Sequence, residues 1–288
     1  MTTQHWLGLG LQASIALTVL GFGMTASWSQ ATYLFRNPAL LLRTVLSMSV
    51  VMPVIVAALV HWVDFRFPVA AALVALAVSP VPPIIQRKEI AAGGRMDYVV
   101  GLMVAMSVLA IVLVPLSLTI LDRVFDAQGV LTIAAIAKIM ATTVLLPLAL
   151  GLVLHQSWPA SQRASGAVLT AAGILLAVTA LILIVGLWPV VRTFIGNGMI
   201  CAMAVVAAIG LAVGHFLGGP LEADRTTLAI STASRHPAVA LALATSGPRG
   251  EIQTELAIIL AYLVVATIVC IPYQKWRARH QSPETRSS

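Results

Sequence analysis

The chain has 288 residues, of which 59% are hydrophobic and only 9% are charged, and its formal net charge at pH 7 is +7. A soluble globular domain carries about 25% charged residues, so this composition excludes an ordinary soluble protein and predicts an all-α polytopic membrane protein. Most basic residues lie in short loops and near the C-terminus, where they set membrane orientation. We therefore expect the lipid bilayer, and no nucleic acid, as a partner.

The apolar stretches are long enough to cross a bilayer about nine times. Because a spanning helix needs about 20 mostly apolar residues, we predict spans at residues 6–27, 38–61, 67–92, 97–121, 131–154, 166–189, 194–218, 225–247 and 252–272. The first stretch begins at Trp6, and no Lys or Arg precedes it. We expect a permanent helix there, since a cleaved signal peptide needs a basic segment at its start.

The third span contains a break. Its sequence is FPVAAALVALAVSPVPPIIQRKEIAAGG, with Pro80, Pro82 and Pro83 near its middle. A regular helix cannot accommodate three prolines so close together, so we predict that it breaks after about 13 residues. The charged residues that follow the break are interpreted as a rim at the cytoplasmic face: Arg87, Lys88 and Glu89.

The fifth and seventh spans carry single features of interest. Lys138 lies about 10 Å into the fifth span at 1.5 Å per residue, and its long side chain can extend toward water. The stripe GLAVGHFLG in the seventh span indicates close helix packing through Gly210, Gly214 and Gly218. Cys201 and Cys270 are interpreted as small buried residues, and we expect no disulfide, metal site or cofactor.

The eighth span, which includes TLAISTASRHPAVALALATS, brings Arg235, His236 and Pro237 together at its middle. An arginine at the centre of a bilayer helix costs about 3 kcal/mol on insertion scales. Pro237 also removes a backbone donor and clashes with the preceding turn. We therefore predict a second break, at residues 234–237, with Arg235 facing the protein interior where the two breaks cross.

The two interrupted helices stand five spans apart and enter from opposite faces. Interrupted helices at corresponding positions of two halves indicate a secondary transporter with inverted repeats. The alternative is a pair of ordinary proline kinks whose free backbone groups are satisfied by neighbouring helices. Polarity is concentrated at the breaks rather than in the repeated polar rings that usually line a channel, and no metalloprotease or nucleophile-elbow motif suggests an enzyme.

Basic residues also predict the orientation. With an outside N-terminus, the inner loops and tail hold eleven of them: Arg36, Arg43, Arg87, Lys88, Arg95, Arg163, Arg225, Lys275, Arg277, Arg279 and Arg286. The outer loops hold four: Arg66, Arg123, Arg192 and Arg249. This asymmetry predicts an outside N-terminus and a cytoplasmic C-terminus in the cell membrane. Residues 1–274 would form one transporter domain, and residues 275–288 a basic cytoplasmic tail.

The chain resembles the bile acid:sodium symporter family along nearly its whole length. WLGLGLQASIALTVLGFGMTAS and FRNPALLL resemble an apolar helix and a basic-x-Pro step, and MPVIVAALV a Met-Pro helix. SPVPPIIQRKEIAAGG is similar to the first break of that family, a Pro-Gly-Gly-x-x-Ser-Asn segment. AKIMATTVLLPLALGLVLH resembles a helix with a lysine and Leu-Leu-Pro, and TLAISTASRHPAVALALA the second break, usually Glu-x-Gly-x-Gln-Asn.

The resemblance implies ten helices in two inverted repeats, arranged as a panel and a core. This chain would begin at the second of them, which leaves nine. Panel-like helices would occupy 6–61 and 131–189, and core-like helices 67–121 and 194–272. The lysine at position 138 would then belong to the family pattern, with a fixed ion pair as the alternative to an outward-extended side chain.

The departures from the family concern sodium, which coupled members hold with oxygen ligands. The matching positions here are Met48, Ile85, Gln86, Val99, Met103, Ser231 and Arg235. Few of these side chains offer oxygen, and a guanidinium repels a cation. Sodium coupling is therefore not expected, although a symporter that uses other ligands remains the alternative. A tethered guanidinium at Arg235 could replace the ion and, with the following half-helix, suit an organic carboxylate or sulfonate.

We therefore expect a secondary transporter of a small organic anion, and not an enzyme. The predicted substrate or ion pathway comprises Arg235, His236, Pro237, Ser234, Ser231, Gln86, Pro80, Pro82 and Pro83, with Lys138, Met48 and Met103 as secondary candidates. Arg235 could instead only hydrogen-bond free carbonyls at the break. His236 could titrate in a proton-coupled cycle or act as a neutral hydrogen-bond partner. Substrate identity and oligomeric state do not follow from the sequence.

Overall fold

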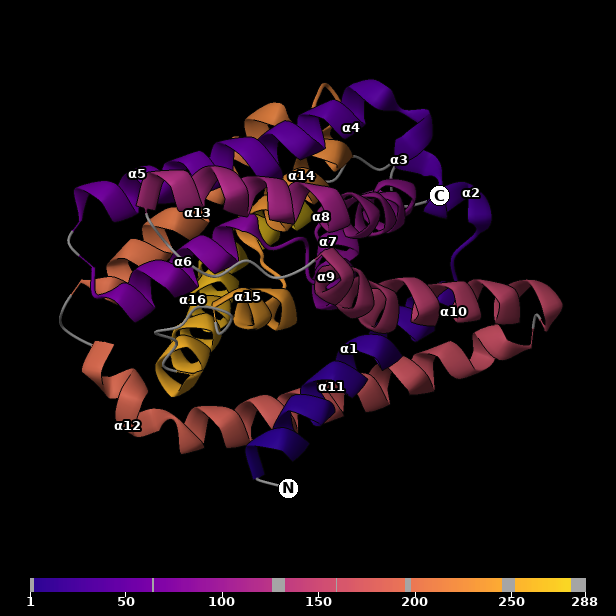
Figure 1. Ribbon diagram of the computed structural model, residues 1–288. Helices are drawn as coiled ribbons and strands as arrows, with labels where there is room; N and C mark the ends of the chain where they lie inside the picture. Colours follow the sequence, from indigo (N-terminus) through magenta and orange to yellow (C-terminus); the bar gives the residue numbers. More distant parts are fainter. Residues whose placement is uncertain are drawn as a thin grey trace.

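A computed structural model describes residues 3–63, 65–125, 133–158, 160–194, 198–244 and 252–280, and every regular element in these ranges is helical (Figure 1). The first part of the chain forms α1 (Thr3–Gly23), α2 (Trp28–Ala31), α3 (Tyr33–Arg36), α4 (Pro38–Val45), the π-helix η1 (Leu46–Val51), α5 (Met52–Trp62), α6 (Phe67–Val78), the 3-10 turn η2 (Pro83–Ile85), α7 (Gln86–Ala91) and α8 (Met96–Phe125). The second part forms α9 (Ile133–Met140), the π-helix η3 (Ala141–Leu145), α10 (Leu146–Ser157), α11 (Ser161–Gly186), α12 (Trp188–Val191), the 3-10 turn η4 (Arg192–Phe194), α13 (Met199–Leu217), α14 (Glu222–Ala233), α15 (Pro237–Ala244) and α16 (Ile252–Arg279).

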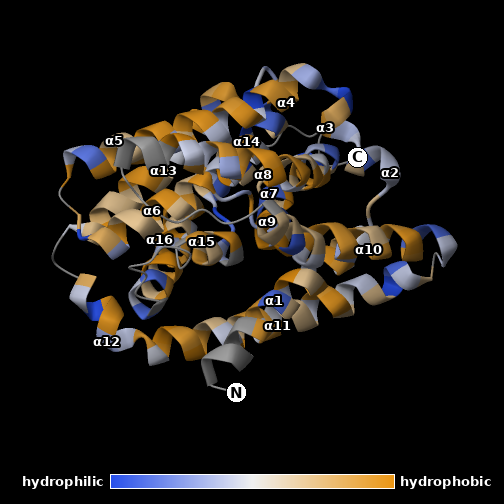
Figure 2. Cartoon of the chain, viewed as in Figure 1, coloured by the Kyte–Doolittle hydropathy of each residue, from blue (hydrophilic) through white to orange (hydrophobic). Residues whose placement is uncertain are grey.

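Length and composition allow six of these helices to cross a membrane: Pro38–Trp62, Met96–Ile120, Ala134–Ser157, Ser161–Gly186, Met199–Leu217 and Gln253–Arg279. The pair α6 and α7, bent by 65°, makes a seventh if it is one span. Hydrophobic residues predominate along these helices (Figure 2). The protein is thus an all-α polytopic membrane protein, while the count of nine spans stays a prediction, because α14 and α15 are short and residues 245–251 lie outside the described ranges.

The helices form two groups (Figure 1). Helix α1 packs along α10 and α11, whereas α6, α13, α14, α15 and α16 pack on one another. The stretch 38–61, which the sequence assigns to the panel, lies against α6, α8 and α13. The division into panel and core stays a prediction, and these contacts favour placing this stretch with the core.

Both π-helices precede a proline that stands two residues after their last residue. Pro53 follows η1 and Pro147 follows η3. A proline ring within a helix clashes with the carbonyl four residues earlier, and a wider π-turn gives that carbonyl room while the helix continues. Each span therefore passes its proline without ending there.

The glycine stripe of α13 lies directly against α14, as predicted. A Cβ atom at Gly214 would lie 2.4 Å from the carbonyl oxygen of Leu228, and one at Gly218 would lie 2.4 Å from Cα of Arg225. Only a residue without a side chain lets the two backbones approach this closely. The stripe thereby fixes the half-helix that leads into the second break.

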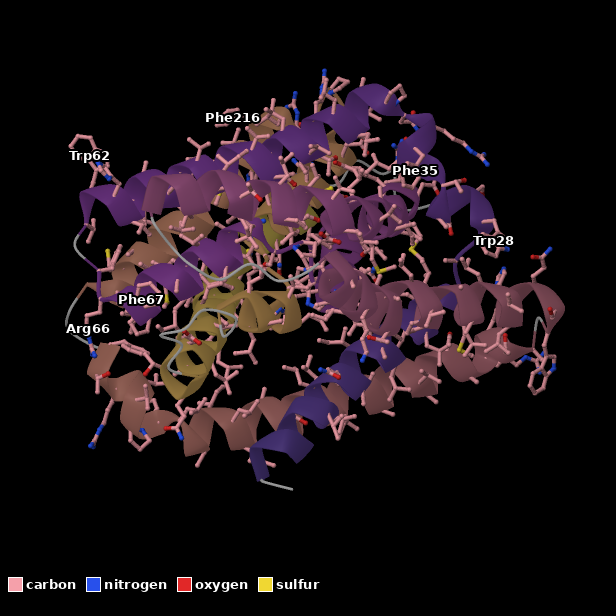
Figure 3. The ribbon with its side chains drawn as sticks, in the orientation of Figure 1. Trp28, Phe35, Trp62, Arg66, Phe67 and Phe216 are labelled. Carbon is pink, nitrogen blue, oxygen red and sulfur yellow. The ribbon has the colours of Figure 1, made fainter. Side chains whose placement is uncertain are left out.

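Aromatic side chains mark the two ends of the molecule. Figure 3 shows Trp62 and Phe67 with Arg66 at one end, and Trp28 and Phe35 at the other. All four aromatic residues are exposed, Trp62 to 83%. Tryptophan is enriched at membrane–water interfaces because one part of its ring system is apolar and one part is polar, so these two ends are where the lipid headgroups would lie.

One expectation about a single residue needs correction, and the end of the last helix lies later than predicted. Cys201 is exposed on α13, whereas Cys270 is buried as predicted. Helix α16 continues to Arg279, so the first residues of the predicted tail are helical, and residues 281–288 lie outside the described ranges. Arg277 explains the extension, because its guanidinium bonds to Glu222 and Thr226 of α14 and holds the helix end against it.

Candidate functional site at the crossing of two broken helices

The first break lies between α6 and η2. Helix α6 ends at Val78, and Ser79 and Pro82 have extended backbone, with ψ angles of 145° and 132°. The three prolines of this region, Pro80, Pro82 and Pro83, are all buried. Proline has no backbone N–H and fixes φ, so the local sequence accounts for the extended segment without any help from tertiary contacts.

The second break lies between α14 and α15. Helix α14 ends at Ala233, Ser234 is extended with φ −108° and ψ 147°, and helix resumes at Pro237. Two bonds stabilise the end of α14: the Ser234 N–H donates to the Ser231 carbonyl at 3.2 Å, and the Tyr262 hydroxyl donates to the Ala233 carbonyl at 3.0 Å. The break therefore falls where the sequence predicts it.

The two breaks are in direct contact. The backbone N–H of His236 donates to the carbonyl oxygen of Pro80 at 2.9 Å, and Nη1 of Arg235 lies 3.4 Å from the carbonyl oxygen of Ser79. Carbonyls freed by one broken helix are thus bonded by groups from the other. The predicted crossing geometry, with Arg235 facing the interior, is confirmed.

Arg235 is buried without an acidic partner. Its side chain is 1% exposed, and no carboxylate of the described residues lies within 4 Å of it. Its Nη2 atom has no hydrogen-bond partner, and the Tyr262 hydroxyl interacts with the guanidinium. A guanidinium keeps its charge in proteins, so the crossing holds an uncompensated positive charge with free N–H donors.

His236 is fully buried next to Arg235, and neither of its ring nitrogens has a hydrogen-bond partner among the described residues. The neutral hydrogen-bonding role considered for this ring is therefore not realised in this conformation. A cavity of about 10 Å³ lies against Ser79 and Pro80 and is also lined by Met48 and Met106. This volume suits about one water molecule, so the first break is closely packed on that side.

Three of the remaining candidates lie near the first break, and one does not. Gln86 donates from its amide nitrogen to the sulfur of Met103, while its amide oxygen has no partner. Met48 lines the small cavity beside Pro80. Lys138 is exposed on α9, and no carboxylate of the described residues lies within 4 Å of it, so the ion pair considered for it is not formed there.

Glu89 is the polar residue that the sequence interpretation placed wrongly. Arg87 and Lys88 are exposed, as a rim requires, but Glu89 is only 1% exposed and accepts a hydrogen bond from the Ser231 hydroxyl. Its position three residues after the buried Gln86 puts both side chains on one face of α7. That spacing is the signal that could have identified Glu89, once Gln86 was assigned to the interior.

Most of the side chains at the positions that match the family's ligands do not suit a sodium ion, although Gln86 and Ser231 carry oxygen. Met48, Ile85, Val99 and Met103 are buried and carry no oxygen. Hard cations take several oxygen ligands. In the part of the chain that the structure describes, no group of three or more His, Cys, Asp or Glu residues is arranged to hold a metal ion.

A sequence model described as the Sodium Bile acid symporter family matches residues 13–192. The match includes the first break and ends before α13, so the second break lies beyond it. A search among curated proteins finds no match to this chain.

Proposed function

Because the chain belongs to the Sodium Bile acid symporter family, whose members are transporters, we propose that this multi-pass membrane protein is a secondary transporter of a small organic anion. We propose further that the anion binds through Arg235 and that sodium does not drive its transport. A sodium-coupled symporter is the second candidate, which the family description favours.

The buried guanidinium is the single observation that supports the anion. A buried charge is normally paired, because an unpaired one costs several kcal/mol. Arg235 instead meets the Ser79 carbonyl at 3.4 Å and the neutral hydroxyl of Tyr262, and it keeps one nitrogen free. A carboxylate or sulfonate would supply the missing charge, and the N-terminal end of α15 at Pro237 adds the positive end of a helix dipole.

The same charge supports transport without sodium. Arg235 lies at a position that matches a sodium ligand of the family, and its guanidinium puts a fixed positive charge there. A second cation beside it would be repelled, by about 4 kcal/mol at 4 Å for an effective dielectric constant near 20. The fixed charge of Arg235 can therefore take the electrostatic role that a bound sodium ion has in the sodium-coupled members of the family.

We propose the cell membrane as the location, with an outside N-terminus and a cytoplasmic C-terminus. Four arginines of the predicted inner set, Arg36, Arg43, Arg95 and Arg225, line two adjoining surface pockets at one end of the molecule. Basic residues gathered at one end agree with the positive-inside rule.

The test is uptake into proteoliposomes of three labelled anions of different size: taurocholate, p-aminohippurate and pyruvate. We expect uptake of at least one above protein-free liposomes, and inhibition by unlabelled anions but not by their uncharged esters or amides. Absence of uptake for all three, or equal inhibition by uncharged analogues, would contradict an anion site.

A further inference from the structure

Glu89 lies where the half-helices α7 and α14 of the two broken helices meet. It belongs to α7, the short half-helix after the first break, and its side chain is 1% exposed while its neighbours Arg87 and Lys88 are exposed. An ionisable residue inside a membrane domain is costly, and such residues mark proton or ion pathways. The role proposed for Arg235 leaves this carboxyl group unexplained.

The partner of Glu89 comes from the other broken helix. The hydroxyl of Ser231, one turn before the second break on α14, donates to Oε1 of Glu89 and is itself fully buried. This bond joins α7 to α14, just as the His236–Pro80 bond joins the two breaks. Any movement that separates the half-helices must therefore break the contact and change the surroundings of the carboxyl group.

No basic side chain compensates Glu89. Within the described ranges no Lys, Arg or His nitrogen lies within 4 Å of its carboxyl oxygens. The titratable groups near it are Tyr98 from α8 and Cys270 from α16, while η2 brings none. Asp224 at the start of α14 is paired with Arg95 at 3.1 Å. A carboxyl group in such surroundings is accommodated as the neutral acid, because burial of an isolated carboxylate is far more costly.

We propose that Glu89 carries the proton that couples transport in this protein, an inference that rests on the proposed function. In the conformation described here the carboxyl group is protonated and bonded to Ser231. When the half-helices separate and water reaches it, the O–H bond breaks, the proton passes to water and the carboxylate remains. The carboxylate is protonated again from the other side of the membrane, which completes the cycle. One proton then crosses with each monovalent anion, so transport moves no net charge.

Infrared spectroscopy of the purified full-length protein in nanodiscs tests the proton without any substrate. At neutral pH we expect a carboxylic acid C=O band that Glu89→Gln removes. Asp97→Asn serves as the matched control, because Asp97 is a half-exposed carboxyl group eight residues away, and it should leave the band unchanged. Ser231→Ala keeps the acid but removes its hydrogen bond, so the band should move to higher frequency.

Two results would overturn the proposal at this stage. If Glu89→Gln leaves the acid band intact and Ser231→Ala does not shift it, Glu89 holds no proton. If sodium added at constant pH abolishes the wild-type band, the carboxyl group binds a cation in place of the proton. The Ser231 variant keeps the test valid even if Glu89→Gln does not fold.

Coupling is then measured with whichever anion the uptake assay identifies. An inward gradient of one pH unit can drive up to about tenfold accumulation when one proton crosses per anion. We expect the wild type to accumulate the anion, and Glu89→Gln to equilibrate it without accumulation. Equal accumulation by both proteins would overturn the coupling role. If the wild type transports none of the anions, the proposed function fails, and the infrared band still decides whether Glu89 holds a proton.

Discussion

Arg235 has the largest of the fully buried side chains in the described part of the chain. Its environment distinguishes a binding role from a structural one. A purely structural arginine at a break would saturate its five N–H donors on free carbonyls. Arg235 makes one long contact to a backbone carbonyl, that of Ser79 at 3.4 Å, interacts with the Tyr262 hydroxyl, and leaves Nη2 without a partner. The N–H groups of Nη2 are thus free to bind a ligand at the crossing.

Removal of the guanidinium should weaken anion binding. We expect Arg235→Ala to cost about 1.5–3 kcal/mol, the range for a hydrogen bond to a charged group, which is roughly ten- to a hundredfold in Kd. The Kd of Arg235→Lys should lie between those of the wild type and Arg235→Ala, since lysine keeps the charge but loses the planar arrangement of N–H donors. Competition binding of the transported anion, with the protein in nanodiscs, measures Kd for the wild type, Arg235→Ala and Arg235→Lys. Arg66→Ala is the control, because Arg66 is exposed near Phe67 at one end of the molecule (Figure 3); equal losses in both variants would refute a specific role.

At the scale of elements, the breaks could be predicted because their causes are local. Proline lacks a donor and restricts its neighbours wherever it stands, so the extended segments at 79–82 and 234–236 follow from the residues themselves. The position of Glu89 could not be predicted in the same way. The direction in which α7 leaves the first break, bent by 65° from α6, decides which face of α7 is buried, and this angle depends on tertiary packing.

The glycine stripe gives a prediction about packing between elements. Gly214→Ala should destabilise the protein by about 1–3 kcal/mol, because the added methyl group would meet backbone atoms of α14 that cannot move aside. Gly166→Ala on α11 is the matched control, since nothing lies within 4 Å of the added atom, and it should not lower stability. The measurement is the midpoint of thermal unfolding of the wild type, Gly214→Ala and Gly166→Ala in the same detergent. A lower midpoint for both, or for neither, would contradict the close packing of α13 on α14.

At the scale of the whole molecule, composition and the positions of prolines predict a polytopic helical protein and the crossing of its two broken helices. Details that depend on several helices at once could not be predicted. The π-helices at 46–51 and 141–145 arise from how each span passes its proline. The packing of the stretch 38–61 against α6, α8 and α13 arises from side chains on six elements, since the stretch itself comprises α4, η1 and α5, and no single stretch of sequence contains that information.

In the proposed cycle of the whole transporter, a fixed guanidinium replaces a bound sodium ion at the crossing. The most direct test is the initial rate of labelled-anion uptake into proteoliposomes in which sodium is replaced by potassium or by choline, with the same pH on both sides and at two pH values. We predict equal rates in the three salts at each pH. We also expect that the double variant Ser231→Glu with Arg235→Gln does not become strongly sodium-dependent, because Ile85, Val99 and Met103 still lack oxygen ligands. A steep, saturable dependence of the wild-type rate on sodium would contradict the account.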